Sequence, residues 1–297
     1  LHIIDEVLIP NSALPLLQVA SRANASEIVK LMKSAGLHSA LTGKKDFTLF
    51  APSDEAISRL PAGLRNSLSN PKVLKNILLY HLIEGRRGID SFENEELLDT
   101  LATNKSVRAN MYNYGRVITM QGGRILPFKF DLKACNGIVH VVNKVLLPPK
   151  GTIADIIEAN SDFSTFSSLL DKAGLKELLR KRPSLTVFAP VNQAFFRVSK
   201  AKIQRLLEDD YKLQTFLKYH IFQGTLFSPG LWDGCNPYSL NGEAVSVKVT
   251  DSEIKINDAL VKKADVSANN GVIHIVDGVL QTHAKYIGRF FPLLPFV

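Results

Sequence analysis

The sequence repeats itself over most of its length, and this repeat constrains the fold more than any other feature. Three landmarks occur twice in the same order, shifted by 138, 139 and 134 residues: Thr-x-Phe-Ala-Pro at 48–52 and 186–190, Tyr-His at 80–81 and 219–220, and Asn-Gly-x-x-His at 136–140 and 270–274. Solenoid repeats run at roughly 20–50 residues, so a period this long is that of a whole domain. The chain is therefore predicted to be a tandem duplication of one domain.

The first ten residues belong to neither copy. Residues 1–10 match residues 139–148, the end of the first repeat, at the same shift of 138. We expect them to be the tail of a preceding repeat that packs or extends as a strand, and the chain to be a piece of a longer protein. The predicted organisation is a tail at 1–10, domains at 11–149 and 150–285, and a terminal tail at 286–297. Each domain has the usual domain size.

Each repeat begins with helical periodicity and continues with strand-like segments. Apolar residues at helical spacing lead up to Gly36 and Gly174, and a glycine there predicts a helix stop because it adopts the left-handed conformation cheaply. Buried strands are expected at 47–50 and 185–188, ended by Ala-Pro because proline cannot donate to a ladder. Alternating apolar residues predict further strands at 245–249 and 254–256. Helices first and antiparallel strands later indicate an α+β fold.

The composition is that of an ordinary globular protein, with 45% hydrophobic and 22% charged residues. No window approaches the roughly 18 apolar residues that cross a bilayer. The net charge of +8 includes a basic cluster of Arg180, Lys181 and Arg182. This cluster either forms a solvated surface or attracts polyanions such as sulfated glycans. Nucleic acid is disfavoured because the basic clusters have no interleaved aromatic residues and no known binding motif.

Cysteines and glycosylation sequons bear on the cellular compartment. Cys135 and Cys235 lie 100 residues apart at non-equivalent repeat positions, so they indicate neither a disulfide framework nor a metal site. Domains of this size fold without disulfides, so both redox compartments remain open. Asn24 and Asn104 each begin an N-glycosylation sequon, which favours secretion.

The four landmark histidines are the obvious candidates for catalysis. His81 and His220 each end an apolar series at i, i+3, i+4 and i+7, which places the imidazole on the core-facing side of a helix. His140 and His274 lie in strands that are apolar on both faces. All four are therefore predicted to be buried, with hydrogen-bonded ring nitrogens.

Neither a metal site nor a hydrolase site is favoured. A zinc site would need the two histidines of a repeat to join an aspartate, and no close histidine pair supports it. Ser53 and Asp54 become Val191 and Asn192 in the second repeat, so a nucleophile and an acid are lost while the landmarks persist. Phosphate-loop, Gly-x-Ser-x-Gly and His-Glu-x-x-His motifs are absent from the sequence. We expect the protein to have no cofactor and no enzymatic activity. A hydrolase is the distant alternative.

The landmarks resemble the signature blocks of fasciclin-like adhesion domains. Thr-Leu-Phe-Ala-Pro-Ser-Asp-Glu-Ala, the central Tyr-His pair and Asn-Gly-Ile-Val-His-Val-Val carry the resemblance, which covers both repeats. The chain is most similar to the third and fourth domains of the transforming-growth-factor-β-induced protein and periostin family. This resemblance implies a β-sheet wedge packed with several helices, secretion into the extracellular matrix or a membrane-anchored cell-surface location, and binding to integrins, collagen or proteoglycans. A homo-oligomer through the full-length protein is also possible.

The adhesive motifs of the family carry over in part. The Tyr-His region is present in both repeats, whereas the Glu-Pro-Asp-Ile-Met integrin motif is reduced to an aspartate followed by an aliphatic residue. A loop carboxylate can reach a receptor-bound cation, and the alternative is a local hydrogen bond to backbone N–H groups. The candidate receptor contacts are Tyr80, His81, Asp131, Leu132, Tyr219, His220, Asp265 and Val266.

The sequence thus predicts a two-domain piece of a secreted adhesion protein that works by surface contact. Tandem domains on a short linker raise the effective concentration at a second site, so individually weak contacts suffice. The alternative is a glycosaminoglycan-binding module that uses the basic surface. Polyanion binding weakens steeply with salt, whereas integrin binding depends on a divalent metal.

Overall fold

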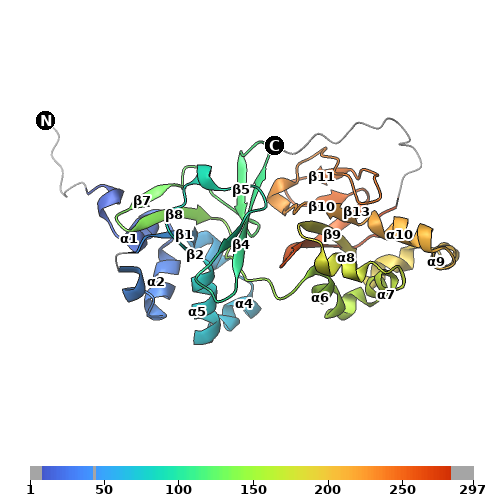
Figure 1. The fold of residues 1–297 in the computed structure, drawn as a ribbon, viewed down its shortest axis with the longest axis horizontal. Coiled ribbons are helices and arrows are strands. Elements are labelled where there is room, and N and C mark those ends of the chain that lie inside the picture. Colours follow the sequence, from blue (N-terminus) through green and yellow to red (C-terminus); the bar gives the residue numbers. More distant parts are fainter. Residues whose placement is uncertain (1–8, 43–44, 282–297) are drawn as a thin grey trace.

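The computed structural model describes residues 9–42 and 45–281, which form two units side by side (Figure 1). In each unit helices cover a β-sheet, so the predicted α+β pair is confirmed. The predicted tail at 1–10 lies outside the described residues except for Ile9 and Pro10, and the tail at 286–297 lies wholly outside them.

The first unit contains two four-stranded sheets, ordered β2-β1-β8-β7 and β3-β4-β5-β6. Its helices are η1 Asn11–Ala13, α1 Leu16–Arg22, α2 Ser26–Ser34, η2 Ser39–Thr42, α3 Asp54–Ser58, α4 Ala62–Ser67, α5 Pro71–Tyr80 and η3 Ile89–Ser91. Its strands are β1 Phe47–Pro52, β2 Leu82–Glu84, β3 Leu97–Asp99, β4 Ser106–Tyr112, β5 Val117–Met120, β6 Gly123–Arg124, β7 Leu132–Ala134 and β8 Gly137–Val142.

The second unit has one six-stranded sheet, ordered β10-β9-β14-β13-β12-β11. Its helices are α6 Ile153–Glu158, η4 Ser161–Phe163, α7 Ser164–Lys172, α8 Lys176–Lys181, η5 Asn192–Arg197, α9 Lys200–Leu207, α10 Asp210–Lys218 and η6 Ser228–Gly230. Its strands are β9 Leu185–Pro190, β10 Ile221–Gln223, β11 Val247–Val249, β12 Ile254–Ile256, β13 Ala259–Ala268 and β14 Gly271–Val276.

The first and last landmarks of each repeat are neighbours in space. β1 pairs in parallel with β8, and β9 pairs in parallel with β14, so the sheets are not purely antiparallel as the order of elements suggested. β1, β8 and β9 are buried along their whole length, which explains their nearly continuous apolar runs. The two strands expected to end before Ala-Pro instead continue through Pro52 and Pro190, because a proline at the last strand position removes only one N–H donor.

The predicted helix stops are confirmed. α2 and α7 end just before Gly36 and Gly174, whose φ angles are +70° and +67°. The Gly36 N–H donates to the Lys33 carbonyl and the next N–H donates to the Met32 carbonyl, which satisfies the last carbonyls of α2.

Candidate functional site

The Tyr-His pairs lie at the carboxyl ends of α5 and α10, inside each unit. His81 and His220 are 1% and 0% exposed, as their place on the apolar series predicted. His81 Nδ1 lies 2.7 Å from the Ile77 carbonyl oxygen, and the Leu146 N–H donates to Nε2 at 3.0 Å. His220 makes the equivalent pair of bonds in the second unit. Burial lowers the pKa of both imidazoles to about 4, so they are neutral at physiological pH.

The second pair of histidines is also buried and bonded to backbone groups. His140 and His274 are both 0% exposed, and burial lowers the pKa of each ring. His140 Nε2 lies 2.8 Å from the Arg87 carbonyl oxygen, while its Nδ1 accepts from the Asp131 N–H at 3.3 Å. Each landmark histidine therefore joins two backbone segments as one donor and one acceptor, and has no ring nitrogen left for a substrate or a metal.

Other polar landmark residues also stabilise the fold. The Asn136 side chain accepts from the Leu16 N–H, which fixes the start of α1 to the sheet, and Asn270 holds α6 in the same way. Asp54 accepts from the Glu27 N–H at the start of α2, and its second-repeat counterpart Asn192 makes the same bond at the start of α7. The exchange of aspartate for asparagine is thus neutral for helix capping, because either side chain supplies the oxygen. Ser53 caps α3.

The two candidate receptor aspartates both have left-handed backbones and both bind a backbone N–H group of their own unit. Asp131 accepts from the Ile89 N–H at 2.9 Å, and its side chain is 34% exposed. Asp265 accepts from both the N–H and the hydroxyl of Ser228 at 2.7 Å, and its side chain is only 9% exposed. These contacts support the local structural alternative, above all for Asp265, and the receptor role of both aspartates stays a prediction.

The remaining candidate contacts offer little surface. Tyr80 and Tyr219 are 0% and 2% exposed. The Tyr80 hydroxyl donates to the Ser106 carbonyl, and burial raises the pKa of both phenols. Leu132 and Val266 are partly buried against the hydrophobic cores of their units. A receptor contact at any of these positions stays a prediction.

The predicted basic cluster is largely neutralised by carboxylates. Arg180 lies within 3.4 Å of oxygens of Asp155, Glu158 and Glu177, and Lys181 lies 3.0 Å from Glu177. Hydrogen bonding to Glu177 raises the pKa of Arg180. This arrangement weakens the attraction of the cluster for a polyanion, because three acids stand beside the same cations.

Both sequon asparagines lie on exposed turns. Asn24 lies between α1 and α2 and Asn104 lies between β3 and β4, with φ angles of +65° and +53°. Asparagine tolerates this left-handed conformation better than most residues. Glycosylation at either position stays a prediction.

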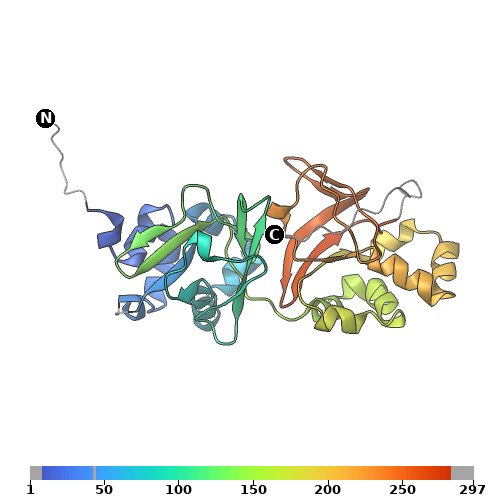
Figure 2. The same ribbon diagram turned by 45° about the horizontal axis from the view of Figure 1, so that its top comes forward.

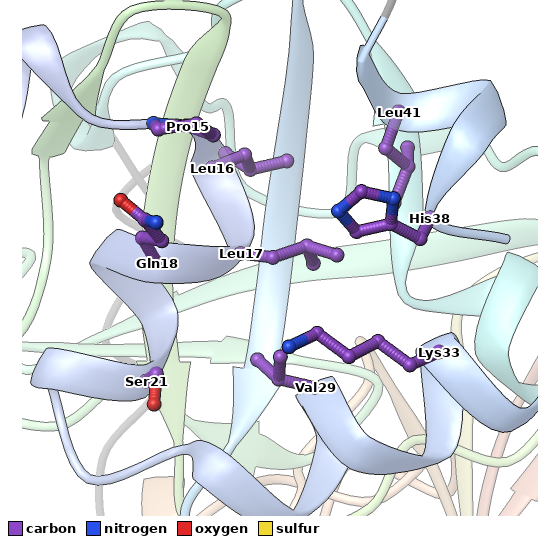
Figure 3. A pocket seen from close by; sticks show the side chains of 9 residues that line it. All are labelled: Pro15, Leu16, Leu17, Gln18, Ser21, Val29, Lys33, His38 and Leu41. Atoms are coloured by element: carbon purple, nitrogen blue, oxygen red, sulfur yellow. The ribbon is translucent and has the colours of Figure 1, made fainter.

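A cavity of about 180 Å³ opens between α1, α2 and η2 (Figure 3). Its lining is Pro15, Leu16, Leu17, Gln18, Ser21, Val29, Lys33, His38 and Leu41. The lining brings Ser21, Lys33 and His38 to one cavity, but within the described residues no hydrogen bond pairs a nucleophile with a base there. Within the described residues, no three His, Cys, Asp or Glu side chains gather as a metal site.

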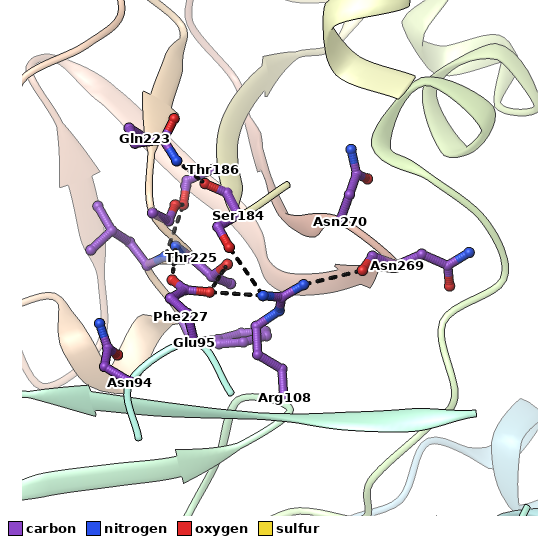
Figure 4. A network of polar contacts seen from close by, with 12 residues as sticks. Asn94, Glu95, Arg108, Ser184, Thr186, Gln223, Thr225, Phe227, Asn269 and Asn270 are labelled. Atoms are coloured by element: carbon purple, nitrogen blue, oxygen red, sulfur yellow. Dashed lines mark hydrogen bonds and ion pairs between the residues drawn. The ribbon is translucent and has the colours of Figure 1, made fainter. Parts of the chain in front are cut away.

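A polar network joins the two units (Figure 4). Arg108 of β4 has a side chain that is only 4% exposed, and its guanidinium lies 2.9 Å from Glu95 Oε2. The guanidinium also donates across the junction to the Ser184 hydroxyl at 3.1 Å and to the Asn269 carbonyl at 3.2 Å. Glu95 of the first unit also bonds to the second unit, because its carboxylate accepts from both the N–H and the hydroxyl of Thr225.

A tyrosine hydroxyl and a second ion pair extend this junction. The Tyr112 hydroxyl donates to the Thr225 carbonyl and accepts from the Phe227 N–H. Lys144 of the first unit lies 3.5 Å from Asp265 of the second. Figures 1 and 2 both show the β4–β5 hairpin between the two units.

Glu95, Arg108 and Tyr112 could not be predicted from the landmarks because they lie outside them, whereas Asp265 is predicted from the sequence as a receptor contact and not as a junction residue. One signal was present: Arg108 interrupts the otherwise apolar start of the Val-Arg-Ala segment at 107–109, and a charge in a buried strand needs a partner.

Comparison with known proteins follows the same division into two units. The sequence matches the fasciclin domain at residues 23–148 and 161–282. The chain therefore belongs to the fasciclin domain family.

Individual relatives match both units together. The chain is 31% identical to the pig (Sus scrofa) transforming growth factor-beta-induced protein ig-h3 over 288 residues, which cover 96% of this chain and 40% of that protein. It is 29% identical to human periostin over 292 residues, which cover 97% of this chain and 34% of periostin. A fasciclin domain pair from the insect cell adhesion molecule fasciclin I aligns over 89% of this chain and 98% of that chain, with a TM-score of 0.43 and 19% identity. The chain spans two fifths or less of these two curated relatives.

Proposed function

We propose that the chain is an adhesive piece of a secreted extracellular-matrix protein that binds integrins and either collagen or proteoglycans without catalysis. Membership of the fasciclin domain family supports this proposal. The observation that carries it is that the four landmark histidines are neutral, buried and fully engaged by backbone groups. Recognition is then left to the exposed surface between the landmarks. A membrane-anchored cell-surface protein is the alternative for its location.

The junction between the units supports a mode of action by avidity. Two domains held by buried polar contacts present their surfaces at a fixed spacing, so the second contact forms at a high effective concentration. Homo-oligomers of the full-length protein would multiply this effect. Among residues 9–42 and 45–281, no helix combines the length and apolar character needed to cross a membrane.

Cell attachment tests the proposal directly. Plates coated with the chain should retain cells in buffer that contains Mg²⁺, and a divalent chelator should release most of them because integrin contacts need a bound cation. The same chain coated after irreversible unfolding is the matched control for nonspecific sticking. Attachment that is equal for folded and unfolded protein, or that ignores the chelator, contradicts integrin binding.

A glycosaminoglycan-binding module is the second candidate, and one observation favours a particular site for it. Lys262 and Lys263 of β13 are exposed, and no carboxylate in the described part of the chain pairs with them. On a heparin column, a variant with both changed to alanine should elute at lower salt than the parent chain. The matched variant with Arg180 and Lys181 changed to alanine should elute near the parent, because those cations already face acids. Equal elution of all three proteins contradicts this site.

A further inference from the structure

Residues with a left-handed backbone conformation show where this fold contains local backbone strain. Eleven described non-glycine residues have φ between +47° and +67°. Six of them are asparagine or aspartate, which adopt this conformation more readily than other side-chain-bearing residues. The remaining five are Glu95, Tyr114, Gln121, Phe128 and Ser184. Each of these is held in a conformation that costs free energy.

Three of the five are compensated inside the molecule. Glu95 and Ser184 bond to the Arg108 guanidinium at the junction. Gln121 Oε1 accepts from the Arg108 N–H at 3.1 Å and lies 3.2 Å from the Tyr80 hydroxyl oxygen. In all three cases the strained backbone directs a side chain at a specific partner.

The two aromatic residues have no such partner in the described part of the chain. Phe128 is 94% exposed and Tyr114 is 100% exposed. Phe128 occupies the third position of a turn that the Lys129 N–H closes onto the Leu126 carbonyl, a position that prefers glycine when φ is positive. Tyr114 precedes Gly115 in the β4–β5 hairpin turn, where asparagine or glycine is preferred. An exposed aromatic ring is thus held on a strained turn twice in the first unit.

Unpaired cations follow both rings closely in the sequence. Arg116 follows Tyr114 by two residues, and Lys129 and Lys133 follow Phe128. Within the described residues no carboxylate forms an ion pair with these three cations. Exposed aromatic rings close in sequence to cations have the composition of interaction hot spots, since an aromatic side chain has only two rotatable χ angles and loses little conformational entropy on binding.

We infer that Phe128 and Tyr114 are contact residues for a protein partner, with each ring entering an apolar pocket whose rim carries carboxylates for the neighbouring cations. The inference rests on the proposed adhesive function and deepens it. It assigns the contact to two turn tips rather than to the Asp131 carboxylate, which the Ile89 N–H engages. A lipid surface is disfavoured because interfacial binding uses a continuous apolar face rather than two separate rings.

Attachment of cells to coated variants tests the inference. Phe128→Asn and Tyr114→Asn each remove a ring but supply a residue that tolerates the left-handed turn. Each should require about tenfold more coated protein for half-maximal attachment. Phe128→Tyr should stay within about twofold of the parent because the ring is kept. The matched control is Phe196→Ser, which removes an 85% exposed ring from η5, where the backbone is not left-handed. This control should attach cells as the parent does.

Two further measurements separate contact from folding and protein from lipid. Phe128→Gly should raise the melting temperature by about 2 °C while it weakens attachment, because it removes the strain together with the ring. Cells stripped of surface protein by trypsin should not attach, and phosphatidylserine vesicles should not bind the parent chain.

The outcomes are distinct. Parent-like attachment of both asparagine variants overturns the inference and leaves the proposed function standing. Ring-dependent binding of the vesicles, or a lowered melting temperature for Phe128→Gly, also overturns it. A parent chain that retains no cells overturns the proposed function and the inference together.

Discussion

At the scale of single residues, the landmarks of this sequence are determinants of the fold. The imidazoles of His81 and His220 each connect a helix carbonyl to a later backbone N–H group. Because Nε2 accepts that N–H, Nδ1 must carry the proton that is donated to the carbonyl. A residue that supplies one buried donor and one buried acceptor cannot be replaced by an apolar side chain without leaving both partners unpaired. Packing and backbone hydrogen bonding therefore account for the presence of these residues in both repeats.

The buried histidines predict an acid-sensitive fold. Their pKa of about 4 in the folded chain lies below the ordinary value of 6.5, so the unfolded chain binds more protons between these two pH values. The free energy of unfolding should keep nearly its full value above pH 6.5. It should fall by about 2 kcal/mol per histidine between pH 7 and pH 4.5. Chemical denaturation across this range measures the effect.

A matched variant isolates the histidine contribution. His220→Gln keeps a donor and an acceptor but cannot be protonated in this range, so the second unit should lose less stability on acidification than it does in the parent chain. A pH dependence of unfolding that is identical in the two proteins contradicts this assignment.

Changing each of the two candidate aspartates to asparagine should reduce the free energy of unfolding by a different amount. In Asp265→Asn one of the two oxygens that bind Ser228 becomes an amide donor and the ion pair with Lys144 is lost, which should cost about 1–3 kcal/mol. Asp131→Asn keeps the one oxygen that accepts from the Ile89 N–H and should cost less than 1 kcal/mol, roughly. Thermal unfolding of both variants measures this order. Lost divalent-dependent attachment with unchanged stability would instead favour the receptor role.

At the scale of elements, the Asn-Gly landmark explains how the last strand of each repeat finds the first. Gly137 and Gly271 begin β8 and β14 with φ angles of +154° and +152°. A Cβ atom at either position would overlap a carbonyl oxygen of the neighbouring parallel strand, Phe47 in the first unit and Leu185 in the second. Only glycine lets the two strands approach at this point.

Gly271→Ala should therefore be far more damaging than an ordinary glycine substitution. We expect a loss of more than about 3 kcal/mol, seen as a low soluble yield or a strongly lowered melting temperature of the second unit. Gly174→Ala is the control, since its φ is also positive but no atom lies within 4 Å of the added carbon. It should cost about 1 kcal/mol. Equal effects of the two changes would show that crowding against Leu185 is unimportant.

Sequence reasoning reached the local features of these elements but not their pairing. The left-handed glycine stops after α2 and α7 and the buried histidines follow from spacing along one chain segment. The parallel pairing of β1 with β8 does not, because a fully apolar run is compatible with several partners. The junction could not be predicted either, because Arg108 meets Ser184 and Asn269 only after both units have folded.

At the scale of the whole molecule, the junction determines whether two domains act as one body. Its contacts are polar: a guanidinium that is 4% exposed, a carboxylate that spans both units, and a tyrosine hydroxyl that bonds twice. Such contacts are specific in direction, and each partner is costly to leave buried and unpaired. Under the proposed function, the spacing of two adhesive surfaces would then depend on very few side chains.

Arg108→Ala should release one unit from the other. The change removes the cation that faces Glu95 and the donors to Ser184 and Asn269, and it leaves the Glu95 carboxylate without its ion pair at the junction. We expect a larger radius of gyration in small-angle X-ray scattering, unchanged far-ultraviolet circular dichroism, and a loss of about 2–3 kcal/mol in the least stable transition. Arg59→Ala is the control, because that arginine pairs with Glu55 on an exposed helix face where an ion pair contributes little. If both variants scatter like the parent chain, the units are held together without the arginine. If Arg108→Ala alone expands, attachment at limiting coating density should fall as well, since under the proposed function a fixed spacing between two weak contacts would give the pair its avidity.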